Sequence, residues 1–135
     1  MQDVFIYLAL SGVLTVLLWT PYILARLFVW GLPTFLNNYP EGFPANQPEP
    51  PLWAQRAQRA HLNMVETMPA FIAVVVAAAL LETGSAEAVA KWAALFFYAR
   101  VLHAIVYIAG VPYLRTPVYL VSWAAILLIG AEVLL

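Results

Sequence analysis

Four long apolar stretches divide the chain, and they predict four helices that cross a membrane. They cover residues 4–25, 52–81, 88–109 and 117–135. A helix needs about 20 mostly apolar residues to cross the hydrocarbon core, and each stretch has about that length. Strands of a membrane barrel would alternate apolar and polar residues over about ten positions, and the chain shows no such alternation. The pattern therefore predicts an all-α, integral membrane four-helix bundle that forms a single domain.

The connections between these stretches differ in length and in proline content. The first connection, residues 31–51, contains Pro33, Pro40, Pro44, Pro48, Pro50 and Pro51. Because proline lacks the N–H that a helix interior needs, we expect an extended loop with no helix, outside the membrane. Pro21 is expected to break the first helix near its end. The connection around Gly84 is short, so the second and third helices should be antiparallel neighbours. A turn at residues 110–112 joins the third and fourth helices.

The composition agrees with a membrane protein and excludes several kinds of chemistry. Hydrophobic types make up 64% of the 135 residues and charged types 10%, where a soluble domain has roughly 25% charged residues. A net charge of -1 disfavours a nucleic-acid partner, which needs a basic surface. Without cysteine the chain offers no disulfide, no thiolate zinc site and no thiol nucleophile. The start of the chain has Asp3 and no basic region, so we interpret the first stretch as a retained helix rather than a signal peptide.

The charged residues are distributed unequally between the two ends of the predicted helices. With four spans, one side receives five arginines: Arg26, Arg56, Arg59, Arg100 and Arg115. The other side receives Lys91 as its one basic side chain, together with Asp3, Glu82, Glu87 and Glu132. Cytoplasmic loops of membrane proteins carry an excess of Lys and Arg. We therefore expect the proline-rich loop 31–51 in the cytoplasm and both termini on the opposite side.

Polar side chains recur at helical spacing inside the apolar stretches. The second stretch carries Arg56, Arg59, Asn63 and Glu66, whose spacing of 3, 4 and 3 places them within about 80° of one another. The third carries Arg100, His103 and Tyr107 on one face, Arg26 ends the first, and Arg115, Thr116 and Tyr119 begin the fourth. All four helices thus bring polar groups to one depth. Ionisable residues inside spans are costly and usually serve a function.

Simpler interpretations of these residues remain open. Glu66 can form a structural salt bridge with Arg100 or Arg59, and this is compatible with a ligand contact. For Arg56 we favour snorkelling to lipid headgroups or a structural use. His103 can donate to a ligand or make a hydrogen bond in the core. His61 lies off the polar face and is expected to face a neighbouring helix or an interface.

The set of arginines exceeds the acidic residues that can balance it. Arg26, Arg59, Arg100 and Arg115 stand against Glu66 alone. Burying unbalanced cations is unfavourable unless an anion joins them. We infer an anionic ligand with carboxylates, which guanidinium groups bind bidentately, and an amine on that ligand would suit Glu66. A metal site is disfavoured, because the possible ligands His61, His103 and Glu66 leave different helix faces.

Residues 56–71 resemble the second-helix signature of the MAPEG family, the membrane-associated proteins in eicosanoid and glutathione metabolism. The shared core is Arg-Ala-His-x-Asn-x-x-Glu at residues 59–66, followed by Pro69 and Phe71. Arg100, His103 and Tyr107 resemble the family's third helix, and Arg115, Thr116 and Tyr119 resemble the start of its fourth. The resemblance covers nearly the whole chain. The nearest branch is the prostaglandin E synthase-like one, which has bacterial members.

This resemblance implies a homotrimer that holds glutathione between adjacent subunits near the cytoplasmic face. The residues implied to bind glutathione are Arg26 of the neighbouring subunit, Arg59, Asn63, Glu66, Arg100, His103, Tyr107 and Tyr119. The catalytic residues implied are Arg115 and Thr116, near the sulfur. Leu62 departs from the pattern, since some relatives have a second basic residue there.

The function expected from these features is a glutathione-dependent membrane transferase, isomerase or peroxidase. Arg115 would favour the glutathione thiolate, which would attack a lipophilic electrophile that arrives through the lipid bilayer. Two alternatives remain. One is a small proton-coupled transporter with Glu66 as the proton carrier. The other is a non-catalytic member that binds glutathione or a lipid.

Overall fold

The described part of the chain folds into helices joined by turns. The computed structural model describes residues 1–37 and 49–135, and within them it contains no strand. The helices are α1 (Gln2–Leu17), α2 (Trp19–Trp30), α3 (Leu32–Leu36), α4 (Leu52–Leu81), α5 (Ala86–Ala109) and α6 (Arg115–Leu134). Four helical segments are long and apolar enough to cross a membrane: Gln2–Trp30, Leu52–Leu81, Ala86–Ala109 and Arg115–Leu134. The prediction of an all-α chain with four long apolar helices is confirmed.

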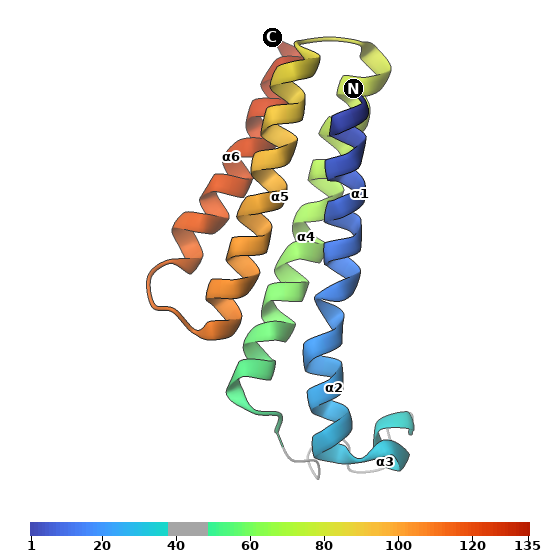
Figure 1. Cartoon of the computed structure of the whole chain (residues 1–135), viewed down its shortest axis with the longest axis vertical. Helices are drawn as coiled ribbons and strands as arrows, with labels where there is room; N and C mark the ends of the chain where they lie inside the picture. The colour runs from blue at the N-terminus through green and yellow to red at the C-terminus, as the bar shows by residue number, and fades with distance from the viewer. Residues whose placement is uncertain (38–48) are drawn as a thin grey trace.

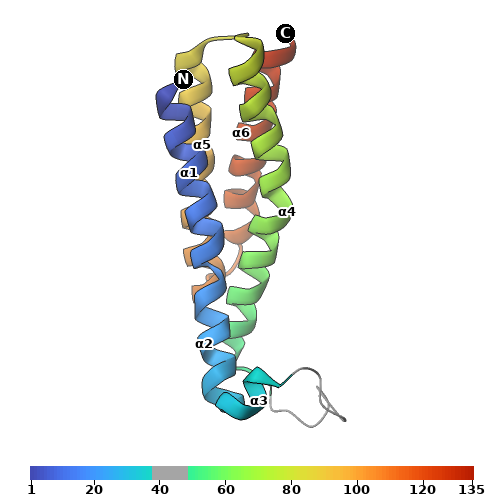
Figure 2. The same cartoon turned by 90° about the vertical axis from the view of Figure 1, so that its right-hand side faces the viewer.

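The long helices form an elongated bundle with two different ends (Figures 1 and 2). α5 packs against α1, α4 and α6, and α4 also contacts α2 and α6. Both chain termini and the α4–α5 connection lie at one end. α2, the start of α4 and the α5–α6 connection lie toward the other end. The second end is therefore where the sequence concentrates its arginines.

The first membrane helix continues beyond its predicted end. α1 and α2 are separated at Leu18, which keeps helical angles (φ -65, ψ -19) and donates its N–H to the Leu14 carbonyl at 2.9 Å. Pro21 has no N–H for the carbonyl of Leu17, which explains an interruption in this turn. The helix then runs on to Trp30, so Pro21 interrupts the hydrogen bonding without ending the helix.

The expectation that the proline-rich connection contains no helix is wrong at its beginning. Leu32–Leu36 form the short helix α3, with Pro33 in its first turn. Proline is tolerated there because the N–H groups of the first turn have no partner within a helix. Most of the remaining connection, residues 38–48, lies outside the described residues.

The core lies between α4 and the helices around it. Eight buried residues of α4 recur at intervals of three and four: Ala54, Ala57, Ala60, Met64, Met68, Phe71, Val75 and Ala78. This spacing forms one continuous helix face, and its alanines allow close approach of neighbouring helices. Phe71 stacks on Phe96 of α5, with ring centroids 3.9 Å apart. Outside the core, large apolar side chains such as Phe28 and Leu80 are 82% and 77% exposed, as lipid-facing residues of spanning helices would be.

Candidate functional site

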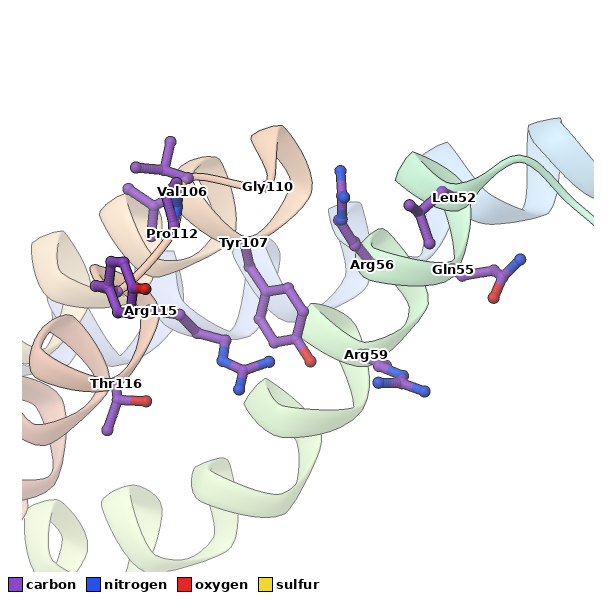
Figure 3. Close-up of a pocket in the computed structure, with 12 residues that line it drawn as sticks. Leu52, Gln55, Arg56, Arg59, Val106, Tyr107, Gly110, Pro112, Arg115 and Thr116 are labelled. Atoms are coloured by element: carbon purple, nitrogen blue, oxygen red, sulfur yellow. The ribbon is translucent and has the colours of Figure 1, made fainter.

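A pocket opens at the arginine-rich end of the bundle, where α4, α5 and α6 meet (Figure 3). Its volume is about 490 Å³, within the range of about 300–1,000 Å³ that small-molecule sites occupy. The lining residues from α4 are Leu52, Gln55, Arg56 and Arg59; those from α5, the following turn and α6 are Val106, Tyr107, Gly110, Val111, Pro112, Tyr113, Arg115 and Thr116. The pocket therefore joins two segments that are about 50 residues apart in the sequence.

The turn between α5 and α6 forms one wall of this pocket. α5 ends at Gly110, whose φ of 72° is a left-handed conformation that glycine adopts without a steric penalty. The N–H groups of Gly110 and Val111 satisfy the carbonyls of Tyr107 and Val106 at 3.1 and 3.0 Å. Such bonds close a helix C-terminus without help from side chains. α6 then begins at Arg115, which places this arginine and Thr116 at the pocket.

Three arginines border the pocket, and no carboxylate lines it. Arg56 is half-buried, whereas Arg59 and Arg115 are exposed. The guanidinium of Arg115 lies over the ring of Tyr107, 4.8 Å from its centroid. In Figure 3 the Tyr107 ring lies between Arg115 on one side and Arg56 and Arg59 on the other. No ion pair joins any of the three to an acidic side chain within residues 1–37 and 49–135. The pocket is thus a concentration of positive charge that suits an anion.

Arg100 lies behind the pocket and is fully buried, with 1% of its surface exposed. Its guanidinium donates to Asn63 Oδ1 at 2.6 Å, to Met64 Sδ at 3.3 Å and to Ser122 Oγ at 3.5 Å. None of these acceptors carries a charge. The hydrogen bonds offset part of the cost of burying a cation, and they tie α5 to α4 and α6. The predicted alternative of a salt bridge between Arg100 and Glu66 is therefore not formed within the described residues.

A series of ring contacts links Arg100 to Arg115. Arg100 lies 5.7 Å from the ring centroid of Tyr119, which is 6.2 Å from that of His103. His103 in turn meets Tyr107 edge-on at 5.5 Å, and Tyr107 carries Arg115 on its face. His103 is only 2% exposed. The predicted residues of the third and fourth helices, apart from Thr116, thus form one series of contacts, in which Arg100 and His103 have almost no exposed surface.

The polar face of α4 separates into two columns. Arg56 and Asn63 are half-buried and turn toward the bundle, whereas Arg59 and Glu66 are exposed on its outside. Residues seven apart on a helix differ by only about 20° in direction, so each pair forms a column. Glu66 makes no ion pair with Arg59 or any other described residue. The outer column is therefore open to a ligand or to another protein surface.

Arg26 stands apart from the other predicted site residues. It lies on α2, with its guanidinium 5.4 Å from the ring centroid of Tyr22 and 5.6 Å from that of Trp30. Within one chain it does not line the pocket. Of the two expected surroundings of His61, a neighbouring helix or an interface, the structure shows a neighbouring helix, since its Nδ1 lies 2.9 Å from the hydroxyl of Tyr22 on α2. This hydrogen bond fixes α2 against α4 one turn before Arg26.

Two features of the site were not predicted. Arg56, interpreted as a snorkelling or structural side chain, lines the pocket with Arg59. Its spacing of three residues from Arg59 indicates a shared place in the pocket, because side chains three residues apart are neighbours on a helix surface. Ser122 and Met64, which accept hydrogen bonds from Arg100, carry no distinctive motif. In the described part of the chain, no three His, Asp or Glu residues gather as a metal site.

Comparison with known proteins gives one match. The model of the MAPEG family matches residues 4–135, which is essentially the whole chain. No curated protein and no solved structure matches it.

Proposed function

The chain belongs to the MAPEG family, and from this premise we propose that it is a membrane glutathione transferase acting on lipophilic electrophiles. The observation that carries the proposal is the pocket bordered by Arg56, Arg59 and Arg115 without a carboxylate. Guanidinium groups that border a pocket without an acidic partner can form charge-assisted, bidentate hydrogen bonds with the carboxylates of a ligand. A transferase for lipophilic electrophiles also needs access to molecules dissolved in the bilayer. The four helices that are long and apolar enough to cross a membrane support such access.

Glutathione fits the charges of this end of the bundle. The tripeptide has two carboxylates and one amine, and its thiol becomes a third anionic group on ionisation. Arg59 and Asn63 are proposed to hold the peptide, and Glu66 its amine, with Arg26 supplied by a neighbouring subunit. The exposed positions of Arg59 and Glu66 on α4 leave both available.

Arg115 and Thr116 are proposed to act on the sulfur. A free thiol has a pKa of about 8.5, so only a few per cent is thiolate at pH 7. When bound, glutathione supplies the nucleophilic sulfur that a chain without cysteine lacks. A guanidinium beside the sulfur stabilises the ionised form, and the hydroxyl of Thr116 can donate a hydrogen bond to it. Tyr107 keeps Arg115 in place through contact with its ring face.

Arg100 and His103 are proposed to support the site from behind. Their burial to 1% and 2% exposure leaves little surface for ligand contact. Arg100 instead donates a hydrogen bond to Asn63 Oδ1. The amide nitrogen of Asn63 is then proposed to donate toward the ligand. Tyr119 lies between Arg100 and His103 and completes this support.

A homotrimer would cover the outer column of α4. Glu66 lies 15 residues before the end of α4, about 22 Å along the helix axis, which is within a hydrocarbon core of about 30 Å. A carboxylate at that depth is costly when it faces lipid, so a second copy of the chain is proposed to cover this face.

The orientation in the membrane is proposed from the excess of arginine at the pocket end. Because cytoplasmic loops carry an excess of basic residues, the pocket is proposed to face the cytoplasm and both termini the opposite side.

The test is conjugation of glutathione to chlorodinitrobenzene by purified protein. The reaction forms a carbon–sulfur bond and expels chloride, while the thiol proton leaves to water. We expect Arg115→Ala to reduce the turnover rate about 100-fold, as expected for a group that stabilises developing charge. Thiolate absorbance of bound glutathione at pH 7 should disappear in the same variant. Lys91→Ala, at the other end of the bundle, is the matched control and should retain both signals.

Other outcomes point to the alternatives. Turnover that is unchanged in Arg115→Ala would remove this residue from the mechanism. Glutathione binding without turnover across a panel of electrophiles would indicate a non-catalytic member. Proton-coupled efflux in vesicles that is lost in Glu66→Gln would instead support a transporter.

A further inference from the structure

A groove separate from the arginine pocket lies between α1 and α5, at the end of the bundle where both helices begin. The two helices run in the same direction and lie side by side (Figures 1 and 2). The groove has a volume of about 500 Å³, and its lining residues are Asp3, Ile6, Tyr7 and Leu10 from α1 and Ala90, Lys91, Ala94 and Tyr98 from α5. Residues at such spacing share one face of a helix, so the groove is built from two facing helix surfaces.

Aromatic rings hold these two surfaces together. Tyr7 is half-buried, and its ring centroid lies 6.2 Å from that of Phe97 and 6.0 Å from that of Tyr98. Tyr98 is 59% exposed. Tyrosine is enriched where a membrane meets water, because its ring is apolar and its hydroxyl is polar. The contacts indicate a fixed groove near the membrane surface.

Charged and apolar residues occupy different depths of the groove. Asp3 lies in the first turn of α1, and Lys91 lies about 7.5 Å from the start of α5 along its axis. α5 is about 36 Å long against about 30 Å for the hydrocarbon core, so a long side chain in its first turns can reach the headgroups. Further into the bundle the groove is bordered by Ile6 and Leu10, which are 47% and 40% exposed. A charged entrance is thus followed by an apolar channel.

The two charges at the entrance are not neutralised within the fold. Asp3 makes no ion pair with Lys91 or with any other residue of the described ranges. The ammonium of Lys91 lies over the ring of Trp92, 5.0 Å from its centroid, and a ring carries no net charge. Glu87, one turn before Lys91 on α5, neither lines the groove nor forms an ion pair with it. One anion and one cation therefore remain available at the mouth of the groove.

We propose that this groove binds one phospholipid whose headgroup carries a phosphate and a primary ammonium group, as phosphatidylethanolamine does. Lys91 pairs with the phosphate and Asp3 accepts hydrogen bonds from the headgroup ammonium. One acyl chain lies against Ile6 and Leu10. The proposal goes beyond the transferase function and does not rest on it, because this groove and the arginine pocket lie toward opposite ends of the bundle.

The combination of charges discriminates between classes of lipid. Phosphatidylglycerol offers a phosphate to Lys91 but leaves the Asp3 carboxylate beside an anion with no cation to bind. Phosphatidylcholine has a quaternary ammonium without N–H groups, so it cannot donate hydrogen bonds to Asp3. A headgroup without acyl chains would leave the apolar channel uncovered. Phosphatidylethanolamine satisfies all three parts of the groove.

The experiment measures which lipid the purified protein retains. Protein in detergent is mixed with equal amounts of phosphatidylethanolamine, phosphatidylcholine and phosphatidylglycerol with identical acyl chains, and bound lipid is quantified by native mass spectrometry. We expect wild type to retain phosphatidylethanolamine about fivefold over either of the others, as charge-assisted hydrogen bonds near water would give. Asp3→Asn should lose most of this preference. Glu87→Gln, which removes a negative charge at the same end but outside the groove, is the matched control and should keep it.

Lys91→Gln should produce a different result from Asp3→Asn. Phosphatidylethanolamine and phosphatidylcholine both carry a phosphate, so both should bind about fivefold more weakly while the ratio between them is retained. Lys91→Arg keeps the positive charge and should restore binding. A melting temperature for each variant in detergent establishes that the protein is folded.

Three results would overturn the assignment. Equal retention of phosphatidylethanolamine and phosphatidylcholine by wild type would show general contact with lipid only. A preference for phosphatidylglycerol would mean that Asp3 takes no part in binding. Equal effects of Asp3→Asn and Glu87→Gln would show that net charge at this end decides retention, and not the groove. None of these measurements uses glutathione, so their failure is distinguishable from failure of the proposed function.

Discussion

A glycine with positive φ lies close to each end of α5, but the two glycines make room for different groups. At the N-terminal end, a Cβ added at Gly84 would lie 2.5 Å from the backbone oxygen of Glu132 on α6. At the C-terminal end, a Cβ added at Gly110 would meet the guanidinium of Arg56. Both glycines have positive φ, 75° and 72°. Gly84 lets the connection between α4 and α5 approach the backbone of α6, and Gly110 leaves space for a charged side chain.

The polar groups near Gly84 have hydrogen-bond partners within the fold, and those near Gly110 differ from them in this respect. Near Gly84, Glu132 accepts a hydrogen bond from the Ser85 N–H at 3.1 Å, and Ser85 Oγ accepts one from the Ala88 N–H at 3.2 Å. Near Gly110, Arg56, Arg59 and Arg115 have no acidic partner within the described residues. Polar groups at the first end thus make hydrogen bonds within the fold, whereas the three arginines at the second end make no ion pair within the described residues. Substitutions at the two ends should separate stability from binding.

The largest expected change in stability is that of Gly84→Ala. Positive φ is strained for alanine, and the added methyl group would collide with backbone that cannot move independently of α6. We expect a loss of about 2–4 kcal/mol in the free energy of unfolding, measured by denaturant titration in detergent. Gly12→Ala, where no atom lies within 4 Å of the added Cβ, is the control and should not destabilise the protein. Equal stability of the two variants would contradict a closed contact at Gly84.

Gly110→Ala should be less destabilising but should weaken ligand binding. The same left-handed strain costs about 1–2 kcal/mol, while the colliding guanidinium of Arg56 can move aside. Because Arg56 is then displaced from the pocket, we expect the affinity for glutathione to fall. Denaturant titration and calorimetry on the same preparation measure both effects. An affinity of Gly110→Ala for glutathione equal to that of wild type would indicate that the position of Arg56 does not affect ligand binding.

Ser85→Ala should reduce stability without altering the pocket. It removes the side-chain acceptor at the N-terminus of α5, a loss of about 1 kcal/mol for a typical helix cap. The affinity for glutathione should equal that of wild type, since Ser85 lies at the opposite end of α5. A change in affinity that exceeds the measurement error would mean that the two ends are coupled.

The smallest expected effect is that of salt on binding. Arg59 and Arg115 are exposed, so added ions should screen their attraction for an anionic ligand. Between 0.05 and 0.5 M NaCl we expect the affinity for glutathione to fall two- to threefold, about 0.5 kcal/mol. The melting temperature of Gly84→Ala relative to wild type should stay constant over the same range. Affinity that does not depend on salt would argue against contact with these exposed cations.

Much of the architecture could be predicted because the bilayer constrains it strongly. Long apolar stretches have few alternatives to spanning helices when backbone groups must be satisfied within the segment. The helical spacing of Arg56, Arg59, Asn63 and Glu66 also placed these residues on one broad face. The prediction that residues 31–51 contain no helix is wrong at α3, because proline is tolerated in the first turn of a helix, where Pro33 lies. The number of prolines in a segment does not show where in a helix each would stand.

The candidate site was predicted less completely than the helices. An arc of about 80° is wide enough for neighbouring helices to divide it, so spacing alone did not separate the inner column from the outer one. The binding role of Arg100 stays a prediction, and the structure adds that its guanidinium donates hydrogen bonds to Asn63 and Ser122, which the spacing of residues does not indicate. The close approach of Arg56 to Gly110 joins residues 54 positions apart, and no local pattern encodes it.

The order of amino acids alone decided that this chain forms long apolar helices, that its arginines gather toward one end and that it resembles the MAPEG family. These properties follow from composition and from the helical repeat, which act over neighbouring residues. Tertiary structure decided which cations are buried behind the pocket and which border it. That distinction depends on packing between α4, α5 and α6, because burial and hydrogen bonding of a guanidinium are set by groups distant in the sequence.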